Sequence, residues 1–489
     1  MNFPILSYMI FIPFVGIIAV LLLKKEQVQA IRWASALFSF IPLVLSFFLL
    51  AHYDSSTSTM QFVEKHNWIP SLGVTYFLGA DGLSVPMLFL TALLSFLSVI
   101  ASFNINFRVK EYFAFFLLLE VGMMGVFAAL DFFLFYIFWE VMLVPMYFLI
   151  GIWGGPRKEY AAIKFFLYTL FGSVFMLIGI LALYFTSQPH TLDMMQLISQ
   201  APLLGRGFQL IVFVAFFLAF AIKVPVFPFH TWLPDAHVEA PTAVSVILAG
   251  ILLKMGTYGL LRVSLPMFPK AALYYALPLA LLALINIVYG ALVCMAQKDL
   301  KKMVAYSSVS HMGYCILGIS ALTVTGVSGC VFQMFSHGLI TGALFLLVGV
   351  LYDRAHTRDI DAFGGLWAKI PVYTGVMTLF CLGSLGLPGL SGFISEFMVF
   401  IGSFPVFKVI VALAVLGVVI TAAYFLRMIQ KMFLGTFNTK WEALTEISGR
   451  ELFTVVPLAV LMIGVGVYPS PLADMIKATL ENIVHLVTG

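Results

Sequence analysis

The sequence predicts an all-α polytopic membrane protein of about 14 transmembrane helices. Of its 489 residues, 62% are hydrophobic and only 10% are charged, against roughly 25% charged in an ordinary soluble domain. Apolar runs of about 20 residues, the length that crosses a bilayer, recur along the chain. Two of these runs are interrupted by proline or glycine beside a charged residue. A water-soluble fold is therefore excluded.

The predicted spans follow from these apolar runs, taken in order. They cover residues 3–23, 31–51, 82–104, 111–130, 131–151, 162–185, 207–229, 242–264, 271–296, 303–324, 328–351, 373–403, 405–432 and 452–469. The fourth and fifth spans meet around Asp131. The first run has no basic region before it and no small-residue cleavage site, and it is long enough to span a bilayer, so we expect a retained first helix. The last stretch, Pro471 to Gly489, carries charges at helical spacing and fits an interfacial amphipathic helix.

The distribution of cations predicts the orientation in the membrane. With the N-terminus outside, the inner loops hold eighteen of the 26 Lys and Arg residues and the outer loops hold six, Arg262 among the latter. We therefore expect both termini on the outer, periplasmic side. The two remaining cations, Lys223 and Lys254, lie inside predicted spans.

Two broken spans predict an internal repeat. The seventh contains Pro225 and Pro228 just after Lys223, and the twelfth contains LGLPGLSG just before Glu396. Broken helices at membrane depth line cavities or lie buried, and matched pairs indicate inverted repeats. We therefore expect four regions: 1–110 (spans one to three), 111–264 (first inverted five-helix repeat), 271–432 (second repeat) and 433–489 (last span and amphipathic segment).

Ionisable residues inside spans are the candidate functional residues. A lysine at a span centre costs roughly 2.5–3.5 kcal/mol on insertion scales, so it survives mainly beside a partner or water. The candidates are Glu140, Lys223, Lys254, His311, His337 and Glu396, with Glu120 less central. A purely structural role as interhelical hydrogen bonds is the alternative, but Ser, Thr or Asn would serve it at lower cost. Glu, Lys and His together suit a proton relay.

Other site classes find little support in the sequence. The four cysteines, Cys294, Cys315, Cys330 and Cys381, are too widely spaced for a metal clip or an iron–sulfur cluster. His230 and His237 with Asp235 favour a structural or channel-lining role over a metal site. With a net charge of +4 and no long basic run, the chain is not expected to bind nucleic acid.

Several motifs resemble those of one family. The segments FWE, PFHTWLPDAHVEAPT, LLKMG, KDLKKMVAYSSVSHMG, FSHG and LPGLSGFISEF are similar to the antiporter-like membrane subunits of respiratory complex I, the proton-pumping NADH:quinone oxidoreductase. The resemblance covers roughly residues 80–435, and HTWLPDAHVEAPT is highly specific. It is greatest for the chain-4-like group, called subunit M in bacteria. The chain-2-like paralogues typically have lysine where Glu396 stands.

The resemblance implies a role for each candidate residue. Glu140 and Lys223 resemble the family's Glu–Lys pair, in which the glutamate tunes the lysine and senses the neighbouring subunit. Lys254 resembles the central relay lysine, with His311, His337 and internal water carrying the proton onward. Glu396 resembles the terminal donor or acceptor.

The resemblance also implies a setting for the chain. It implies a non-redox, proton-translocating subunit of a bacterial inner-membrane enzyme, with antiporter-like paralogues on both sides. No cofactor is expected in this chain, because NADH, FMN, iron–sulfur clusters and quinone would bind partner subunits. Two alternatives stay open: a subunit of a multisubunit cation/proton antiporter, or of a related membrane-bound hydrogenase.

Overall fold

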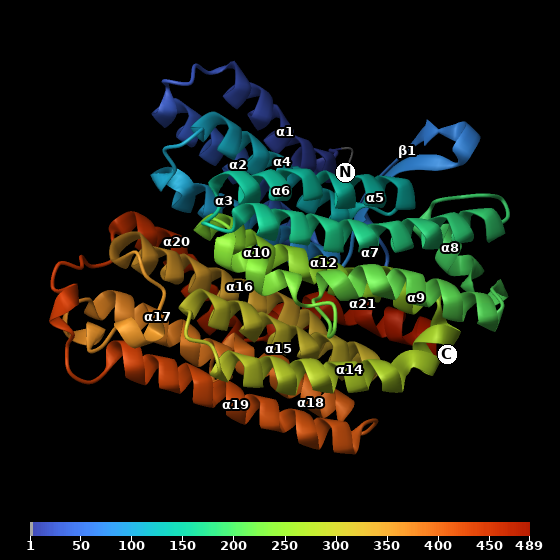
Figure 1. Ribbon diagram of the computed structural model, residues 1–489. Helices are drawn as coiled ribbons and strands as arrows, with labels where there is room; N and C mark the ends of the chain where they lie inside the picture. Colours follow the sequence, from blue (N-terminus) through green and yellow to red (C-terminus); the bar gives the residue numbers. More distant parts are fainter. Residues whose placement is uncertain (1–2) are drawn as a thin grey trace. The chain divides into compact units, whose positions relative to one another are not determined.

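The computed structural model describes residues 3–489 and is mostly helical (Figure 1). The chain forms two compact units, each built from more than one segment. Unit one comprises the chain up to Val224, Ile251–Leu277 and Ala473–Gly489, and unit two comprises Pro225–Gly250 and Pro278–Leu472. The predicted boundaries of the inverted repeats stay a prediction.

Unit one contains most of the N-terminal helices and the one sheet found in the described residues. Its elements are α1 (Ile5–Leu22), α2 (Val28–His52), β1 (Gln61–Ile69), β2 (Val74–Ala80), α3 (Ser84–Ala101), α4 (Val109–Ala128), α5 (Phe132–Val141), α6 (Leu143–Trp153), α7 (Lys158–Thr186), α8 (Met194–Gln200), α9 (Arg206–Lys223), α12 (Leu253–Gly259), α13 (Leu265–Met267) and nearly all of α21 (Ser470–Thr488).

Unit two contains most of the remaining helices. They are α10 (Trp232–Glu239), α11 (Thr242–Ile247), most of α14 (Pro269–Met295), α15 (Leu300–Ser320), α16 (Val324–Ala355), α17 (Pro371–Ser384), α18 (Ser391–Ser403), α19 (Lys408–Phe433) and α20 (Gly449–Val467). Short π-helical turns at Leu248–Leu252 and Leu260–Ser264 flank α12.

The sequence-based expectation of a helical polytopic membrane protein is confirmed at this level. Twelve helices among the described residues are long and apolar enough to cross a membrane, and two shorter apolar helices cover Pro371–Ser384 and Ser391–Ser403. Asp131 lies at the predicted junction of the fourth and fifth spans, where its side chain caps α5 by accepting from the Phe133 amide at 2.9 Å.

Strands β1 and β2 were not expected from the sequence. They pair antiparallel, with Gln61 opposite Ala80 and Ile69 opposite Val74. The turn between them ends at Gly73, whose φ of +65° suits glycine. The hairpin lies beside the start of α1 (Figure 1), where the Glu64 carboxylate accepts from the Leu6 amide at 2.8 Å. This contact satisfies an orphan donor of a helix that has no side-chain cap of its own.

Three cations assigned to loops from the sequence are buried: Arg32, which is 8% exposed, Arg262 and Lys301. Arg262, counted with the outer loops, is only 4% exposed and lies in the π-helical turn after α12. Lys301, counted with the inner loops, is 6% exposed, and its Nζ donates to the Ala240 carbonyl at 2.6 Å. Loop assignment by hydropathy misplaces them because their charges are satisfied by partners far away in the sequence.

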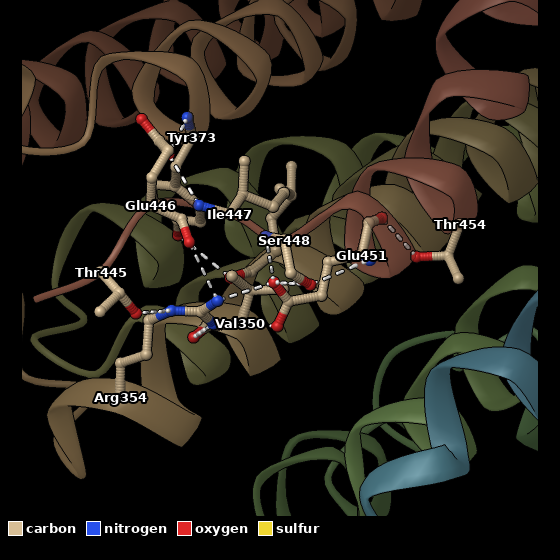
Figure 2. A network of polar contacts seen from close by, with 10 residues as sticks. Val350, Arg354, Tyr373, Thr445, Glu446, Ile447, Ser448, Glu451 and Thr454 are labelled. Atoms are coloured by element: carbon tan, nitrogen blue, oxygen red, sulfur yellow. Dashed lines mark hydrogen bonds and ion pairs between the residues drawn. The ribbon is translucent and has the colours of Figure 1, made fainter.

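A bidentate ion pair joins two helices of unit two. Arg354, in the last turn of α16, donates to both carboxylate oxygens of Glu451 in the first turn of α20, at 2.9 and 2.7 Å (Figure 2). Glu451 also completes a capping box with Ser448. The same guanidinium donates to the Glu446 carbonyl at 3.2 Å. The planar fork of arginine therefore fixes the loop before α20 against the end of α16.

Candidate functional site

Lys223 and Glu140 face each other inside unit one. Lys223 ends α9, because Pro225 lacks the amide donor that would continue the helix. The lysine is 1% exposed, and its Nζ has no hydrogen-bond partner among the described residues. It interacts electrostatically with Glu140 of α5. The site therefore holds an amine and a carboxylate that share a low-dielectric pocket without a direct hydrogen bond.

Two aromatic rings complete the surroundings of Lys223. Its Nζ lies 5.3 Å from the ring centre of Trp139 and 5.7 Å from that of Phe165. Cation–π contacts of this kind stabilise an ammonium by about 0.5–2 kcal/mol. Trp139 is the residue before Glu140, so one turn of α5 supplies both a carboxylate and an aromatic face. Sequence reasoning did not single out Trp139 or Phe165.

Lys254 lies on α12, which packs directly against α9. The lysine is fully buried. Two residues later, Gly256 allows a close approach: a Cβ there would lie 2.7 Å from the Phe220 carbonyl oxygen and 2.6 Å from Cγ2 of Val224. The two lysine-bearing helices therefore meet at the turn that carries Lys223. Unit one brings together three of the six predicted residues, Glu140, Lys223 and Lys254.

Unit two brings together the other three. His311 of α15 lies with its Nδ1 3.3 Å from Oε1 of Glu396 on α18, and its Nε2 lies 3.0 Å from Oγ of Ser384. The rings of His311 and His337 are 5.7 Å apart between centroids. A cavity of about 10 Å³ lies among these side chains, which is roughly the space that one water needs. The two imidazoles and the carboxylate therefore surround a space of about one water, and His311 contacts Glu396 directly.

The chain between α17 and α18 places Glu396 at this cavity. Gly386 and Gly389 have φ of +83° and +92°, a backbone conformation that favours glycine. Gly386 lies against the Glu396 carboxylate, since a Cβ there would be 3.2 Å from Oε2. The turn of Leu385–Leu390 thus separates two short helices and brings Ser384 and Glu396 to the same histidine.

Asn286 holds the irregular segment that follows Lys223. Within unit two, its Oδ1 accepts from the Phe227 amide at 2.7 Å, and its Nδ2 donates to the Pro225 carbonyl at 3.2 Å. Unpaired backbone groups at membrane depth must be satisfied by protein. A buried asparagine in an otherwise apolar predicted span was the available sequence signal, and sequence reasoning missed it.

The comparisons place this chain in a family. A family model described as NADH:quinone oxidoreductase/Mrp antiporter, TM, matches residues 129–421. NADH-quinone oxidoreductase subunit M from Rickettsia conorii is 42% identical over 494 residues, covering 99% of each chain. The subunit of the same name from Rhodobacter capsulatus is 45% identical over 466 residues, covering 93% of this chain and 90% of the relative. The chain belongs to this NADH:quinone oxidoreductase/Mrp antiporter family.

Solved structures of family proteins agree in fold. A chain of respiratory complex I from Thermus thermophilus with bound NADH matches with a TM-score of 0.90 and 32% identity over the full length of both chains. A chain of the Mrp complex from Dietzia sp. matches with a TM-score of 0.86 and full coverage of both chains, but at 20% identity it supports the fold alone. The match covers both units, so the antiporter-family fold extends over the whole chain.

Residues 3–489 contain no group of three or more His, Cys, Asp or Glu side chains placed to hold a metal ion. His237 instead stacks on Phe345 with ring centroids 4.4 Å apart. The four cysteines are free and buried. The carboxylate, amine and imidazole groups of the six predicted residues are groups that can bind and release a proton.

Proposed function

We propose that this chain is a proton-translocating membrane subunit of a bacterial NADH-quinone oxidoreductase. Electron transfer takes place in partner subunits, which bind NADH, FMN, iron–sulfur clusters and quinone. Near full-length similarity to chains named NADH-quinone oxidoreductase subunit M supports the assignment. The observation that carries it is the buried Lys223 amine, which shares a pocket with Glu140 and two aromatic rings instead of a fixed hydrogen bond.

The pocket around Lys223 suits a reversible change of charge. Moving one proton against a membrane potential of roughly 150 mV costs about 3.5 kcal/mol. Two opposite unit charges at contact distance interact by about 4 kcal/mol at an effective dielectric constant of about 20. Drawing Glu140 toward Lys223, or releasing it, therefore changes the stability of the protonated amine by about the amount that pumping requires.

Lys254 is the next carrier in the proposed path. The contact of Gly256 with Phe220 and Val224 keeps its helix against the end of α9. A proton released by Lys223 when Glu140 moves away passes toward Lys254 over bound water. We propose that Lys223 alternates between Glu140 and Lys254 as its dominant electrostatic neighbour.

His311, His337 and Glu396 form the second half of the relay. His311 contacts both Glu396 and Ser384, and the adjacent cavity accepts about one water. Imidazole can take a proton on one nitrogen and release one from the other. Glu396 is the proposed terminal group, from which the proton leaves to the outer side or to the next subunit.

The proposed topology has 14 spans. Twelve long apolar helices, together with α15 and the pair of short helices α17 and α18, support this number. The irregular segments after Lys223 and before Ser391 are proposed to be the broken helices of two inverted five-helix repeats, 111–264 and 271–432. Both termini are proposed to lie on the periplasmic side, as the cation distribution favours.

Antiporter-like paralogues are the proposed neighbours on both sides of this chain. Glu140 is partly exposed on the isolated chain, which is unfavourable for a carboxylate facing lipid. A neighbouring subunit that covers this carboxylate removes the cost and lets Glu140 sense the neighbour's charge state. This gives the Glu140–Lys223 pair a means of coupling to the next pump.

The test uses the assembled enzyme in inside-out membrane vesicles. Lys223→Ala and Glu140→Ala are each expected to lose most NADH-driven proton pumping and coupled quinone reduction, while native gels show normal assembly. Lys408→Ala, which changes an exposed lysine at the start of α19, is the matched control and should leave both unchanged. Full coupled activity in assembled Lys223→Ala would refute the proposal. Cation/proton exchange without any quinone-linked activity would favour the antiporter alternative.

A further inference from the structure

A second buried ion pair lies in unit one, outside the proposed relay. Arg262 donates from Nη1 to Oδ2 of Asp81 at 2.8 Å and from Nη2 to Oδ1. The two side chains are 4% and 1% exposed. A buried bidentate pair often contributes little net stability compared with apolar residues of the same volume. Net stability therefore gives little reason for this pair to be buried.

The ion pair is built into the end of unit one where the hairpin joins α3. Asp81 directly follows β2, and its Oδ1 also accepts from the Leu83 and Ser84 amides at 3.1 and 3.2 Å, at the start of α3. Gly82 packs closely against α21, where a Cβ on this residue would clash with the Met475 carbonyl oxygen. Its amide also donates to Oγ1 of Thr479 at 3.0 Å. Asp81 is thus held rigidly by three elements.

Arg262 stands on the same helical segment as Lys254. Lys254, Tyr258 and Arg262 follow each other at intervals of four residues, so they share one face of the helix. Eight residues at a rise of 1.5 Å separate the two cations by about 12 Å along the axis. A π-helical turn holds Arg262, and such turns are frequent at functional sites. The path through Lys254 therefore ends, on this side, at Tyr258 and the ion pair.

The hydrogen bonds of Tyr258 stop proton transfer at this end of the path through Lys254. Its hydroxyl donates to the Phe127 carbonyl at 3.0 Å and accepts from Nε of Arg262 at 3.2 Å. While Tyr258 donates its one proton to Phe127, Ser84 is the donor in the 2.9 Å contact between the two hydroxyls. A carbonyl oxygen accepts a proton in a hydrogen bond but has none to pass on. No hydroxyl in this group is free to relay a proton beyond Tyr258.

We propose that Asp81, Arg262 and Tyr258 form a proton-tight seal at the hairpin end of the Lys254 path. The fixed guanidinium contacts both Tyr258 and Asp81 and repels an incoming proton, while the Tyr258 hydroxyl donates to a carbonyl that cannot relay it. The seal prevents protons from returning to Lys254 from the hairpin side. Arg262 and Asp81 are positioning residues in this scheme. The inference rests on the proposed pumping function, which gives Lys254 a proton to protect.

The experiment measures passive proton leak through the intact complex in liposomes, driven by an imposed pH gradient with no NADH or quinone present. The double variant Asp81→Leu/Arg262→Met replaces the pair by apolar residues, so no charge is left buried alone. It is expected to raise the leak roughly tenfold, in keeping with the loss of a charge-assisted hydrogen-bond pair. Adding Lys254→Met should return the leak to the wild-type level.

Two further variants keep the test decisive. Tyr258→Phe is nearly isosteric, so we expect it to assemble. Loss of the hydroxyl leaves room for a water that can relay protons, so a smaller rise in leak is expected. Lys431→Met/Asp361→Leu removes an ion pair whose side chains are 37% and 46% exposed. It is the matched control and is expected to leave the leak unchanged. Wild-type leak in an assembled double variant and in Tyr258→Phe would overturn the seal.

The outcome separates this inference from the pumping proposal. A raised leak that Lys254→Met does not remove would show that the pair does not close the Lys254 path, and would overturn the inference even if pumping through Lys223 is established. Conversely, unchanged pumping in Lys223→Ala would refute the relay but would not change the passive leak expected for Asp81→Leu/Arg262→Met. In NADH-driven assays, loss of the seal should lower protons pumped per NADH while NADH oxidation continues.

Discussion

Replacing Gly256 with alanine should separate the two lysines of the proposed relay. The added Cβ would lie 2.7 Å from the Phe220 carbonyl oxygen, 2.6 Å from Cγ2 of Val224 and 3.0 Å from the Val224 amide nitrogen. Two of these atoms are backbone and cannot rotate away. Because ordinary contacts are about 3.5–4.0 Å, α12 must move from α9 by about 1 Å.

The expected cost follows from this displacement. Overpacking of this kind destabilises a protein by about 1–3 kcal/mol, and a misplacement of about 1 Å at reacting groups can slow a reaction by about 100-fold. We expect Gly256→Ala to assemble with a lowered melting temperature and to lose most NADH-driven proton pumping. The assays are native gels, thermal unfolding of the purified complex, and pumping in inside-out vesicles.

Gly464→Ala is the matched control for this substitution. Gly464 lies within α20 and would have nothing within 4 Å of an added Cβ. Alanine there gains helix propensity of up to about 1 kcal/mol, so stability should be equal or slightly higher and pumping unchanged. Wild-type stability and pumping in Gly256→Ala would show that the close approach of α9 and α12 does not position Lys254, and the reasoning would fail.

Three smaller predictions concern side chains outside that contact. Arg354→Ala should destabilise the folded complex by about 2 kcal/mol, because it leaves the Glu451 carboxylate without its bidentate partner. Arg354→Lys should restore less than half of this stability, because an ammonium cannot form two parallel hydrogen bonds in the same way. Equal melting temperatures for the lysine variant and wild type would contradict this. Trp139→Leu removes an aromatic ring whose centre lies 5.3 Å from Lys223 Nζ. Loss of about 1 kcal/mol of cation–π energy should slow pumping about fivefold. An unchanged pumping rate would argue against the aromatic contribution. The hydrogen bond from Lys431 holds the pKa of Asp361 below its ordinary value. The stabilisation from this carboxylate is therefore present above the pKa of the unfolded carboxyl group and is lost as pH falls through the pKa of the folded one. The melting-temperature difference between wild type and Asp361→Asn should shrink below about pH 4, and a constant difference from pH 7 to 3 would refute this prediction.

Sequence reasoning found the candidate residues because charge is rare in apolar spans. Lys223, Lys254 and Glu396 stand out against long apolar neighbours, and no knowledge of the fold is needed to see their cost. The same rule misplaced Arg262. It lies near the predicted end of a span, where hydropathy alone cannot distinguish a solvated loop from a turn whose charge is satisfied by Asp81, 181 residues away in the chain.

Uncharged positioning residues escaped detection for a related reason. Trp139, Asn286 and Ser384 carry no charge, and the role of each depends on contacts with residues far away in the chain or on another helix. The hairpin was missed because its short strands are stabilised by pairing with each other and by the contact of Glu64 with α1. The hydrophobic periodicity of a segment does not predict its contacts with segments far away in the chain.

Composition and the spacing of apolar runs alone establish that the chain is a membrane protein and that it is mostly helical. They also identify the few ionisable groups that are energetically costly inside the membrane. These properties depend on the transfer of individual side chains from water to lipid, which each residue carries with it. The family resemblance implied the pairing of Glu140 with Lys223, but the grouping of His311 with Glu396 and of Asp81 with Arg262 was decided only by folding. Pairing depends on distances between helices far apart in the chain, and those distances are set by packing contacts such as that of Gly256 with Phe220.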